Sequence, residues 1–226
     1  MFDLMLFIVV LVATFFIGSI PSGFIISKFM YHTDVRDKGS GNIGTTNVMR
    51  TLGTKAGIIV FIMDFCLGLF SGLFGLGVSN FMQGGGFITQ NDLLAASFLG
   101  SVSGHIFCPW LGFKGGKGIA TAVGNLFITF GPVGALLELA VFAVLLLITR
   151  RVSVGSLGSS VTCPFFALYF FWGDWLAVVC CAIAACCAVW AHRNNIKRLM
   201  NGTEPKMGEK KKQQQEAQQG ARKEVE

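Results

Sequence analysis

Long apolar stretches separated by short polar segments dominate the sequence. Seven of these stretches are predicted to form membrane-spanning helices: residues 2–27, 57–79, 93–111, 119–130, 133–148, 154–171 and 175–191. The first would extend roughly 39 Å as a helix, which is enough to cross a bilayer with tilt. The fourth would extend only roughly 20 Å, so it needs the surrounding protein to shield its ends. The pattern predicts an all-α integral membrane protein.

The composition supports this fold class. Hydrophobic residues make up 53% of the chain and charged residues only 13%, with a formal net charge of +6. A soluble domain of this length carries more charge on its surface. The seven cysteines lie mostly within the predicted spans and are expected to pack as small apolar residues. Metal binding by the four at 180–187 is the alternative, and no disulfide framework is implied.

The order of the charges sets the predicted topology. Residues 118–149 form either one helix or two helices broken at Gly131-Pro132, and only two helices keep Arg150 and Arg151 on the same side as the other basic residues. With seven spans every lysine and arginine lies on the cytoplasmic side. The carboxylates near the outer ends are Asp3, Asp92 and Asp174. We therefore predict seven transmembrane helices, with the N-terminus outside and the C-terminus cytoplasmic.

The chain divides into two parts. Residues 1–206 are predicted to form one polytopic membrane domain, and residues 207–226 a charged, disordered cytoplasmic tail. Asp64 and Glu138 lie inside predicted spans, where an ionisable side chain is costly and usually faces the bundle interior. Asp64 is expected to order Arg50 or a neighbouring loop, whereas no partner is evident for Glu138.

Three polar segments are returned to the same membrane surface by this topology. They are residues 34–50, residues 104–105 together with 113–121, and residues 192–206. Long apolar helices separate these segments in the sequence. We interpret their convergence as a candidate active site.

The first segment contains a glycine-rich run from Gly39 to Arg50. Glycines allow positive φ angles and close backbone approach, so successive N–H groups can converge on an anion. The planar guanidinium of Arg50 suits phosphate or carboxylate. Ser40 has no neighbouring base in the sequence, so it is interpreted as a hydrogen-bond donor or a turn residue and not as a nucleophile.

The second segment places Gly115-Gly116-Lys117-Gly118 at the start of a predicted helix. Backbone amides, the charge of Lys117 and the helix N-terminus all favour the binding of a phosphate group. The spacing is not that of a Walker A loop, and no strand precedes it. The alternative is a flexible turn with one cytoplasmic lysine.

The third segment contains His192 and Asn195, which share one face if the last helix continues that far. His192 is interpreted as a general base or as a hydrogen-bond donor to phosphate. The alternative is an interfacial histidine that ends a span. His105, in the second segment, is more typical of a structural hydrogen bond at a helix end.

Together these segments resemble the bacterial glycerol-3-phosphate acyltransferases that use acyl phosphate, the PlsY family. The motifs agree in order and spacing over nearly the whole chain up to Lys206. They are Ser19-Ile20-Pro21-Ser22-Gly23, Asp34-x-Arg36, the run from Gly39 to Arg50, Gly104-His105, Phe113-x-Gly115-Gly116-Lys117-Gly118-x-Ala120-Thr121, His192-x-x-Asn195-Ile196-x-Arg198-Leu199 and Gly202-Thr203-Glu204. Three residues depart from the family pattern: Thr45 replaces alanine, Asn194 an acidic residue, and Leu67 a lysine that often follows Asp64.

The resemblance implies a seven-helix enzyme of the inner (cytoplasmic) cell membrane with its active site on the cytoplasmic side. It implies acyl transfer from acyl phosphate to the sn-1 hydroxyl of glycerol 3-phosphate, which gives lysophosphatidic acid and inorganic phosphate in phospholipid biosynthesis. The partners implied are both substrates, membrane lipid and the upstream enzyme that forms acyl phosphate; no nucleic acid, cofactor or metal is expected. The implied catalytic residues are Ser40, Arg50, Lys117, His192 and Asn195. The expected substrate-binding residues are Gly39, Gly41, Asn42, Thr46, Asn47, His105, Gly115, Gly116 and Gly118.

The residue types fit this chemistry without a covalent acyl-enzyme, because acyl phosphate already carries a good leaving group. Arg50 and Lys117 can hold the two phosphate groups, and Ser40 and Asn195 can orient them. The acceptor of the hydroxyl proton is His192 or a substrate phosphate, and the phosphate is favoured because no carboxylate is placed to tune the histidine. Acyl-CoA and acyl carrier protein are alternative donors. Transport of a phosphorylated solute is less favoured, because the polar residues gather at one face.

Overall fold

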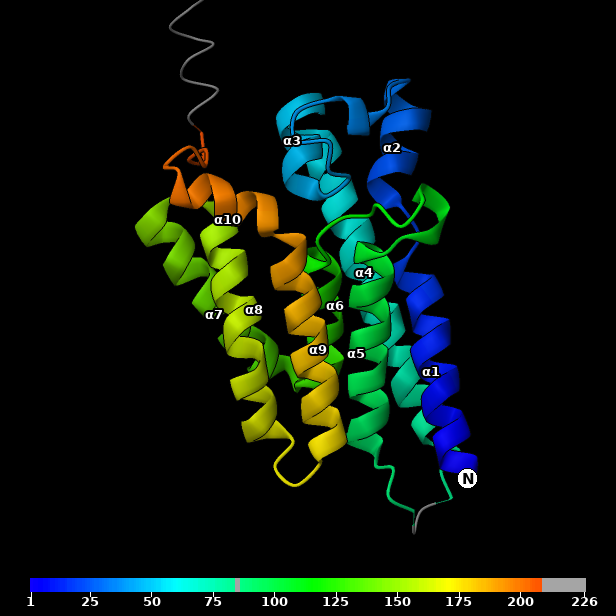
Figure 1. Ribbon diagram of the computed structural model, residues 1–226. Helices are drawn as coiled ribbons and strands as arrows, with labels where there is room; N and C mark the ends of the chain where they lie inside the picture. Colours follow the sequence, from blue (N-terminus) through cyan, green and yellow to red (C-terminus); the bar gives the residue numbers. More distant parts are fainter. Residues whose placement is uncertain (84–85, 209–226) are drawn as a thin grey trace, which may run out of the picture.

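The computed structural model describes residues 1–83 and 86–208, which form ten α-helices and two 3₁₀-helices and contain no strand. Most of the helices run side by side in one bundle (Figure 1). They are α1 (Phe2–Gly18), α2 (Ser22–Tyr31), η1 (Val35–Asp37), α3 (Thr45–Leu52), α4 (Thr54–Ser79), α5 (Gln90–Ile106), η2 (Pro109–Leu111), α6 (Ile119–Thr129), α7 (Gly131–Thr149), α8 (Val152–Phe170), α9 (Trp175–Ala191) and α10 (Arg193–Met200). The tail predicted for residues 207–226 lies outside the described residues except for Met207 and Gly208.

Several helices in the described ranges are long and apolar enough to cross a membrane. Five segments qualify: Phe2–Tyr31, Thr54–Ser79, Gln90–Leu111, Gly131–Thr149 and Val152–Phe170. A sixth is added if α9 and α10, which meet at an angle of 55°, count as one span. Helix α6 has only 11 residues. The predicted all-helical membrane architecture is confirmed, while a total of seven spans stays a prediction that depends on α6.

Two helix breaks have local causes. The predicted break between α6 and α7 is confirmed: Gly131 has φ +69°, and Pro132 stands in the first turn of α7. The span predicted over residues 2–27 is confirmed within the apolar segment Phe2–Tyr31, but the helix is interrupted at residues 19–21, between α1 and α2. Pro21 has no N–H to donate and disfavours a helical conformation in the residue before it.

The two ends of the bundle differ in charge. Helices α2, α3 and α10 and the loop between α5 and α6 lie at one end, while the N-terminus and the α4–α5 and α8–α9 connections lie at the other (Figure 1). We call the first the basic end (residues 24–55, 106–119, 149–153 and 191–208) and the second the acidic end (residues 1–3, 80–83, 86–92 and 171–175). Every lysine and arginine of the described residues belongs to the basic end. The predicted gathering of basic residues at one end is thus confirmed.

Glycines allow the central helices to approach closely. Helix α4 packs on α6, and a Cβ added to Gly124 of α6 would lie 1.9 Å from the carbonyl oxygen of Phe65. Helix α1 packs on α5 in the same way, because a Cβ added to Gly104 would lie 2.0 Å from the carbonyl oxygen of Phe15. Small residues at helix interfaces are typical of membrane bundles, in which van der Waals packing drives association.

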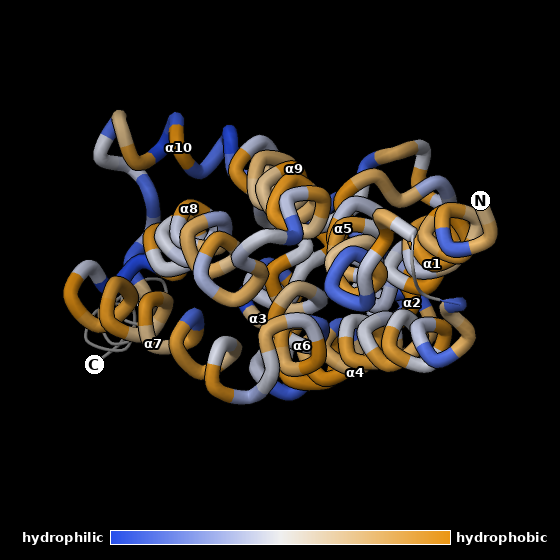
Figure 2. Tube along the Cα trace, turned by 90° about the horizontal axis from the view of Figure 1, so that it is seen from below, coloured by the Kyte–Doolittle hydropathy of each residue, from blue (hydrophilic) through white to orange (hydrophobic). Residues whose placement is uncertain are grey.

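The bundle surface and interior are separated by polarity. Figure 2 shows α4 and α7 mostly in hydrophobic colours, whereas α10 carries a hydrophilic stretch. Inside, Asn125 of α6 donates to the hydroxyl oxygens of Ser101 (3.1 Å) and Ser97 (3.3 Å) of α5, and its Oδ1 accepts from Thr129 at 2.6 Å. These bonds link α5 and α6 at membrane depth and thereby fix the loop between them at the basic end.

Candidate active site

The three polar segments meet at the basic end, as predicted. The Nδ2 of Asn42 in the first segment donates to the carbonyl oxygen of Gly115 in the second at 3.4 Å. The Nζ of Lys117 in the second segment donates to the Oδ1 of Asn195 in the third. Direct side-chain contacts therefore join segments that are 73 and 78 residues apart in the chain.

The first loop is held in shape by the buried side chain of Asn47 on α3. Its Oδ1 accepts from the N–H of Ser40 at 2.9 Å, and its Nδ2 donates to the carbonyl oxygens of Asn42 (2.8 Å) and Lys38 (3.1 Å). Both sides of the amide are thus engaged by the loop backbone. The structure gives Asn47 a role in shaping the loop, in place of the direct substrate contact that we predicted.

The loop glycines serve the same packing. Gly39 has φ +61°, and a Cβ added there would lie 2.3 Å from the Oδ1 of Asn47. Gly41 has φ +71°, and its N–H donates to the carbonyl oxygen of Lys38 at 3.0 Å. The N–H groups of Ser40 and Gly41 are therefore satisfied inside the loop, and the predicted convergence of these amides on an anion is wrong for them.

Three side chains of this segment remain open to a ligand. Ser40 is exposed in the loop, Thr46 is exposed in the first turn of α3, and Arg50 is exposed in the last turn of the same helix. The hydroxyl groups and the guanidinium, and not the amides of Ser40 and Gly41, are groups that this segment offers to an anion.

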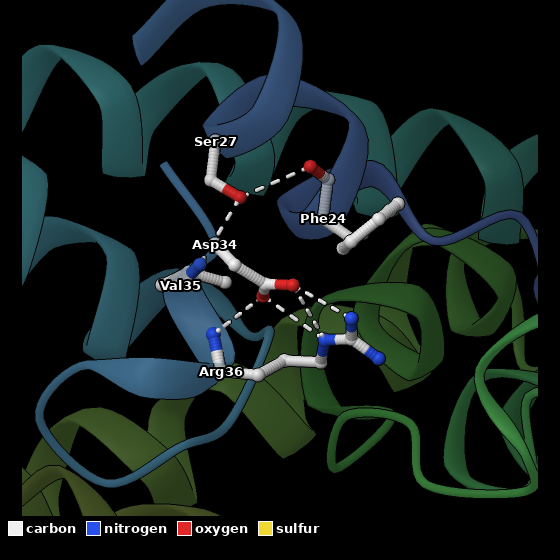
Figure 3. Close-up of polar contacts among 5 residues, drawn as sticks. All are labelled: Phe24, Ser27, Asp34, Val35 and Arg36. Carbon is white, nitrogen blue, oxygen red and sulfur yellow. Dashed lines mark hydrogen bonds and ion pairs between the residues drawn. The ribbon is translucent and has the colours of Figure 1, made fainter. Parts of the chain in front are cut away.

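The approach to this loop is braced by the Asp34-x-Arg36 motif (Figure 3). The guanidinium of Arg36 donates to both carboxylate oxygens of Asp34, at 2.6 Å and 2.9 Å, and lies 4.8 Å from the ring centre of Phe24. The hydroxyl of Ser27 donates to the carbonyl oxygen of Phe24 and accepts from the N–H of Val35. Arg36 lowers the pKa of Asp34 to about 2, so both members of the Asp34–Arg36 ion pair are charged at neutral pH.

The glycine-rich second loop lies against the end of α5. The N–H of Gly115 donates to the carbonyl oxygen of Ile106 at 3.0 Å, and that of Gly116 donates to the carbonyl oxygen of His105 at 2.9 Å. A Cβ added to either glycine would lie 2.0 Å from an atom of His105. These glycines permit close packing, and the prediction that their amides bind a phosphate is wrong.

The end of the same loop still offers an anion site. Gly118 has φ +75° and precedes α6, which begins at Ile119 as predicted. The first N–H groups of a helix have no partner within it and carry partial positive charge. The phosphate-binding groups that remain here are the Lys117 amine and the N-terminus of α6.

Lys117 is half-buried, and this affects its charge. Burial lowers the pKa of its amine to about 8, and the positive charges of Arg198 and Arg50 lower it as well, while the carboxylate of Glu204 opposes the change. The amine is therefore positive at neutral pH but close to losing its proton. Its contact with Asn195 aims it at the junction of the three segments.

The bend between α9 and α10 positions the third segment. His192 stands at this bend with an exposed fraction of 1%, and its Nδ1 lies 2.8 Å from the carbonyl oxygen of Ala188. A carbonyl can only accept, so Nδ1 carries a proton and Nε2 is an acceptor in the neutral ring. His192 and Asn195 lie on the same buried side of the bend, as predicted.

Glu204 was quoted in the sequence analysis only as part of the Gly202-Thr203-Glu204 motif, without a role in the site. Its Oε1 accepts from the Nδ2 of Asn195 at 2.8 Å, its Oε2 accepts from the Nε of Arg198 at 2.7 Å, and its carbonyl oxygen accepts from Arg151 at 3.2 Å. Burial raises the pKa of this carboxyl, but its interactions with Ser153, Asn195 and Arg198 together outweigh burial and lower it. The motif, a single carboxylate among the basic residues 193–206, was the signal in the sequence.

Two residues lie away from the opening of the site. His105 has an exposed fraction of 4%, so the predicted direct contact with substrate is replaced by contact with the second loop. Asp64 accepts from the hydroxyl of Ser22, and its Oδ1 lies 3.8 Å from the Nδ1 of His105. The expectation that Asp64 orders Arg50 is wrong, whereas ordering of a neighbouring loop fits its contacts.

Apolar space borders the site. A groove of about 460 Å³ follows α9 and the start of the α5–α6 loop; it is lined by Phe107, Val179, Ala182, Ile183, Cys186, Cys187 and Trp190. Trp190 is two residues from His192, so the groove leads along the bundle from the third polar segment. A second cavity, of about 50 Å³, lies inside the bundle beside Glu138, whose Oε2 accepts from Thr162 at 3.2 Å.

Comparison with known proteins agrees with this geometry. Residues 8–202 match the family described as glycerol-3-phosphate acyltransferase. A relative from Bacillus anthracis, glycerol-3-phosphate acyltransferase 2, is 38% identical over 200 residues, covering 88% of this chain and 98% of the relative. A glycerol-3-phosphate acyltransferase from Clostridioides difficile is 36% identical over 208 residues, covering 91% and 97%.

Solved structures give the same result. The crystal structure of PlsY, an integral membrane glycerol 3-phosphate acyltransferase, in its glycerol 3-phosphate form has a TM-score of 0.77 and 33% identity, and the match covers 89% of this chain and 96% of that chain. The lysophosphatidic acid form of PlsY has a TM-score of 0.74 and 32% identity, with 89% and 95% covered. The chain belongs to the glycerol-3-phosphate acyltransferase family, the PlsY family, and the resemblance seen in the sequence is confirmed.

Proposed function

We propose that this protein transfers an acyl group from acyl phosphate to the sn-1 hydroxyl of glycerol 3-phosphate. The products are 1-acyl-glycerol 3-phosphate (lysophosphatidic acid) and inorganic phosphate, in phospholipid biosynthesis. Membership of the family supports the acceptor and the class of reaction. The PlsY structures, described as a glycerol 3-phosphate form and a lysophosphatidic acid form, support the same acceptor and product.

The observation that carries the proposal is the charge of the junction where the three segments meet. Arg50, Lys117 and Arg198 are close enough for their charges to affect one another, and Glu204 is the carboxylate that faces them. Glu204 is already bonded to Asn195 and Arg198. The junction therefore keeps net positive charge, which suits two phosphate groups brought together for acyl transfer.

In the proposed step the C1 hydroxyl oxygen of glycerol 3-phosphate attacks the carbonyl carbon of acyl phosphate. The bond between that carbon and the phosphate oxygen breaks, and inorganic phosphate leaves. Arg50 and Lys117 hold the phosphates, the N-terminus of α6 adds partial positive charge, and Ser40 and Asn195 orient the substrates. Asn42, Thr46 and the glycines of both loops shape or border the site.

We assign the hydroxyl proton to an oxygen of a substrate phosphate. The Nδ1 of His192 bonds a backbone carbonyl and not a carboxylate, so no anion raises the basicity of its Nε2. His192 then orients a phosphate group. A His192→Gln variant is expected to keep most of its kcat; a collapse in kcat with little change in KM would make His192 the base.

We place the basic end on the cytoplasmic side of the cytoplasmic membrane, with seven spans and the N-terminus outside. The concentration of lysine and arginine at that end supports this orientation. Glycerol 3-phosphate then arrives from the cytoplasm, and the acyl chain lies in the apolar groove along α9. The enzyme that forms acyl phosphate is the partner that this arrangement requires upstream.

The experiment is an assay of the purified protein reconstituted in lipid, with glycerol 3-phosphate as acceptor. Palmitoyl phosphate, palmitoyl-CoA and palmitoyl-acyl carrier protein are compared as donors, with release of phosphate and formation of lysophosphatidic acid as readouts. Product from acyl phosphate alone, lost in Lys117→Ala, is the expected result. Product formed only from a thioester would show that the donor is acyl-CoA or acyl carrier protein and not acyl phosphate. Uptake of glycerol 3-phosphate into liposomes without any product would show that the protein is a transporter and not an enzyme.

A further inference from the structure

A buried polar cluster lies beneath the second loop. It consists of Ser22 of α2, Asp64 of α4, His105 of α5 and Thr121 of α6, and none of the four has an exposed fraction above 4%. Ser22 donates to the Oδ1 of Asp64, and the same oxygen lies 3.8 Å from the Nδ1 of His105. The cluster joins the four helices that lead into the first and second polar segments.

The imidazole of His105 is fixed on both sides. Its Nδ1 faces Asp64 and lies 3.3 Å from the Oγ1 of Thr121. Both of these neighbours lie at the Nδ1 edge of the ring. The opposite edge of the ring lies against the loop, because a Cβ added to Gly116 would lie 2.0 Å from its Nε2.

The backbone of the same residue also holds the loop, since the carbonyl oxygen of His105 accepts from the N–H of Gly116. Gly116 is the residue before Lys117, and Gly118 has a positive φ. A change in the position of the His105 ring therefore displaces Gly116. It also displaces the next residue, Lys117, whose amine contacts Asn195. A buried carboxylate is costly at membrane depth, and ionisable side chains found there usually have a function. Asp64 is such a residue.

We propose that Asp64 and His105 are positioning residues, which lock the glycine-rich loop so that the Lys117 amine points at the phosphate of the substrate. This inference rests on the proposed function for the identity of that phosphate. Neither residue touches the substrate. Asp64 fixes the ring, the ring fixes Gly116, and Gly116 fixes Lys117.

A purely structural role predicts a different result. Loss of a buried polar contact anywhere in the bundle lowers stability and the fraction of active enzyme, but leaves KM and the pKa of Lys117 unchanged. A positioning role predicts a higher KM for glycerol 3-phosphate. It also predicts a higher pKa for Lys117, because a loosened loop admits water around the amine, while its neighbours Arg50, Asn195, Arg198 and Glu204 are unaltered.

The test uses the full-length protein in lipid nanodiscs, with the variants Asp64→Asn and His105→Gln. We expect KM for glycerol 3-phosphate to rise about tenfold with a smaller change in kcat. Ser22→Ala removes only the donor to Asp64 and should give a weaker change in the same direction, which keeps the test open if the stronger variants fold poorly. Thr129→Val is the matched control, since it removes buried hydrogen bonds of α6 far from the loop.

A second readout needs no substrate. The rate at which an amine reagent modifies Lys117, followed by mass spectrometry as pH is raised, gives the pKa of that amine directly. A higher pKa in Asp64→Asn and His105→Gln, and the wild-type value in Thr129→Val, supports the proposal. Unchanged KM and pKa in Asp64→Asn and His105→Gln, or equal changes in Thr129→Val, would overturn it. A wild-type protein without acyltransferase activity would overturn the proposed function instead, and the labelling result would still decide the role of the pair.

Discussion

The acidic end and the basic end of the bundle are both polar, and both use side chains to connect segments that are far apart in the chain. At the acidic end Asp3 accepts from the N–H of Gln83 at 3.1 Å and Asp174 accepts from Asn91, while Asp92 forms a local capping box with Thr89. At the basic end side chains connect segments far apart in the chain, as Asn42 and Lys117 do.

The two ends differ in their charge balance. Among the described residues the basic end holds thirteen lysines and arginines against three carboxylates, which are Asp34, Asp37 and Glu204. Asp34 is bound by Arg36, and Glu204 by Arg198. Contacts between distant segments therefore occur at both ends, and the unbalanced positive charge is what distinguishes the basic end.

The largest effect is expected from removal of a cation at the basic end. Arg50→Ala should lower kcat/KM for glycerol 3-phosphate about 100-fold, because a group that stabilises anionic oxygens is lost. The kcat/KM of Arg50→Lys should lie between the values of the wild-type protein and Arg50→Ala, because lysine keeps the positive charge but lacks the planar guanidinium. Steady-state phosphate release measures both. Asp3→Asn at the acidic end is the control. An equal loss of kcat/KM in this variant would show that the two ends do not differ in their importance for activity.

The pH dependence should come next in size. Lys117 is protonated below its pKa of about 8 and loses its charge as pH rises through that value. We expect kcat/KM, which reports the free enzyme, to fall about fivefold between pH 8 and pH 9 and about tenfold for each pH unit above that. Lys117→Arg, which stays charged, should move this limb to higher pH. If kcat/KM of Lys117→Arg fell over the same pH range as that of the wild-type protein, the group that titrates would not be Lys117.

A substitution that inserts one methyl group tests loop packing. Gly116→Ala places a Cβ against the His105 ring, and overpacking of this kind costs about 1–3 kcal/mol. KM for glycerol 3-phosphate should rise about fivefold or more as the loop shifts. Gly77→Ala in α4, where a Cβ has open space, should leave KM unchanged. Equal KM values for Gly116→Ala and Gly77→Ala would show that the glycine-rich second loop does not contribute to substrate binding.

The smallest effect should come from a helix cap at the acidic end. Thr89→Ala removes the side chain that accepts from the N–H of Asp92 in the capping box. The free energy of unfolding should fall by about 1 kcal/mol, with kcat and KM unchanged. Thermal denaturation in nanodiscs and the phosphate-release assay together check this. A change in KM would mean that the ends are coupled through α5.

The sequence predicts the helices well, because a membrane span needs a long run of apolar residues and no tertiary information. The break at Gly131-Pro132 is equally local. The interruption before Pro21 was harder to place because the surrounding residues stay apolar, and a hydropathy pattern does not register a short break in the helix.

The site was predictable in its cations and its location but not in the use of its glycines. A glycine that exposes an amide to a ligand and a glycine that makes room for a side chain look the same in a sequence. Gly39 makes room for Asn47, and Gly116 for His105, and both contacts are set by helix packing. Glu204 reaches Asn195 only because the chain bends after α9 and folds back, which no local pattern indicates.

The short helix α6 has a consequence for how the protein is made. At 11 residues it is about 16 Å long, roughly half of a hydrocarbon core of about 30 Å. Its contact with α4 brings Gly124 against the Phe65 backbone, a fit that lipid cannot replace. We therefore expect α6 to insert together with α7, as a hairpin, against the α4 that precedes it in the chain.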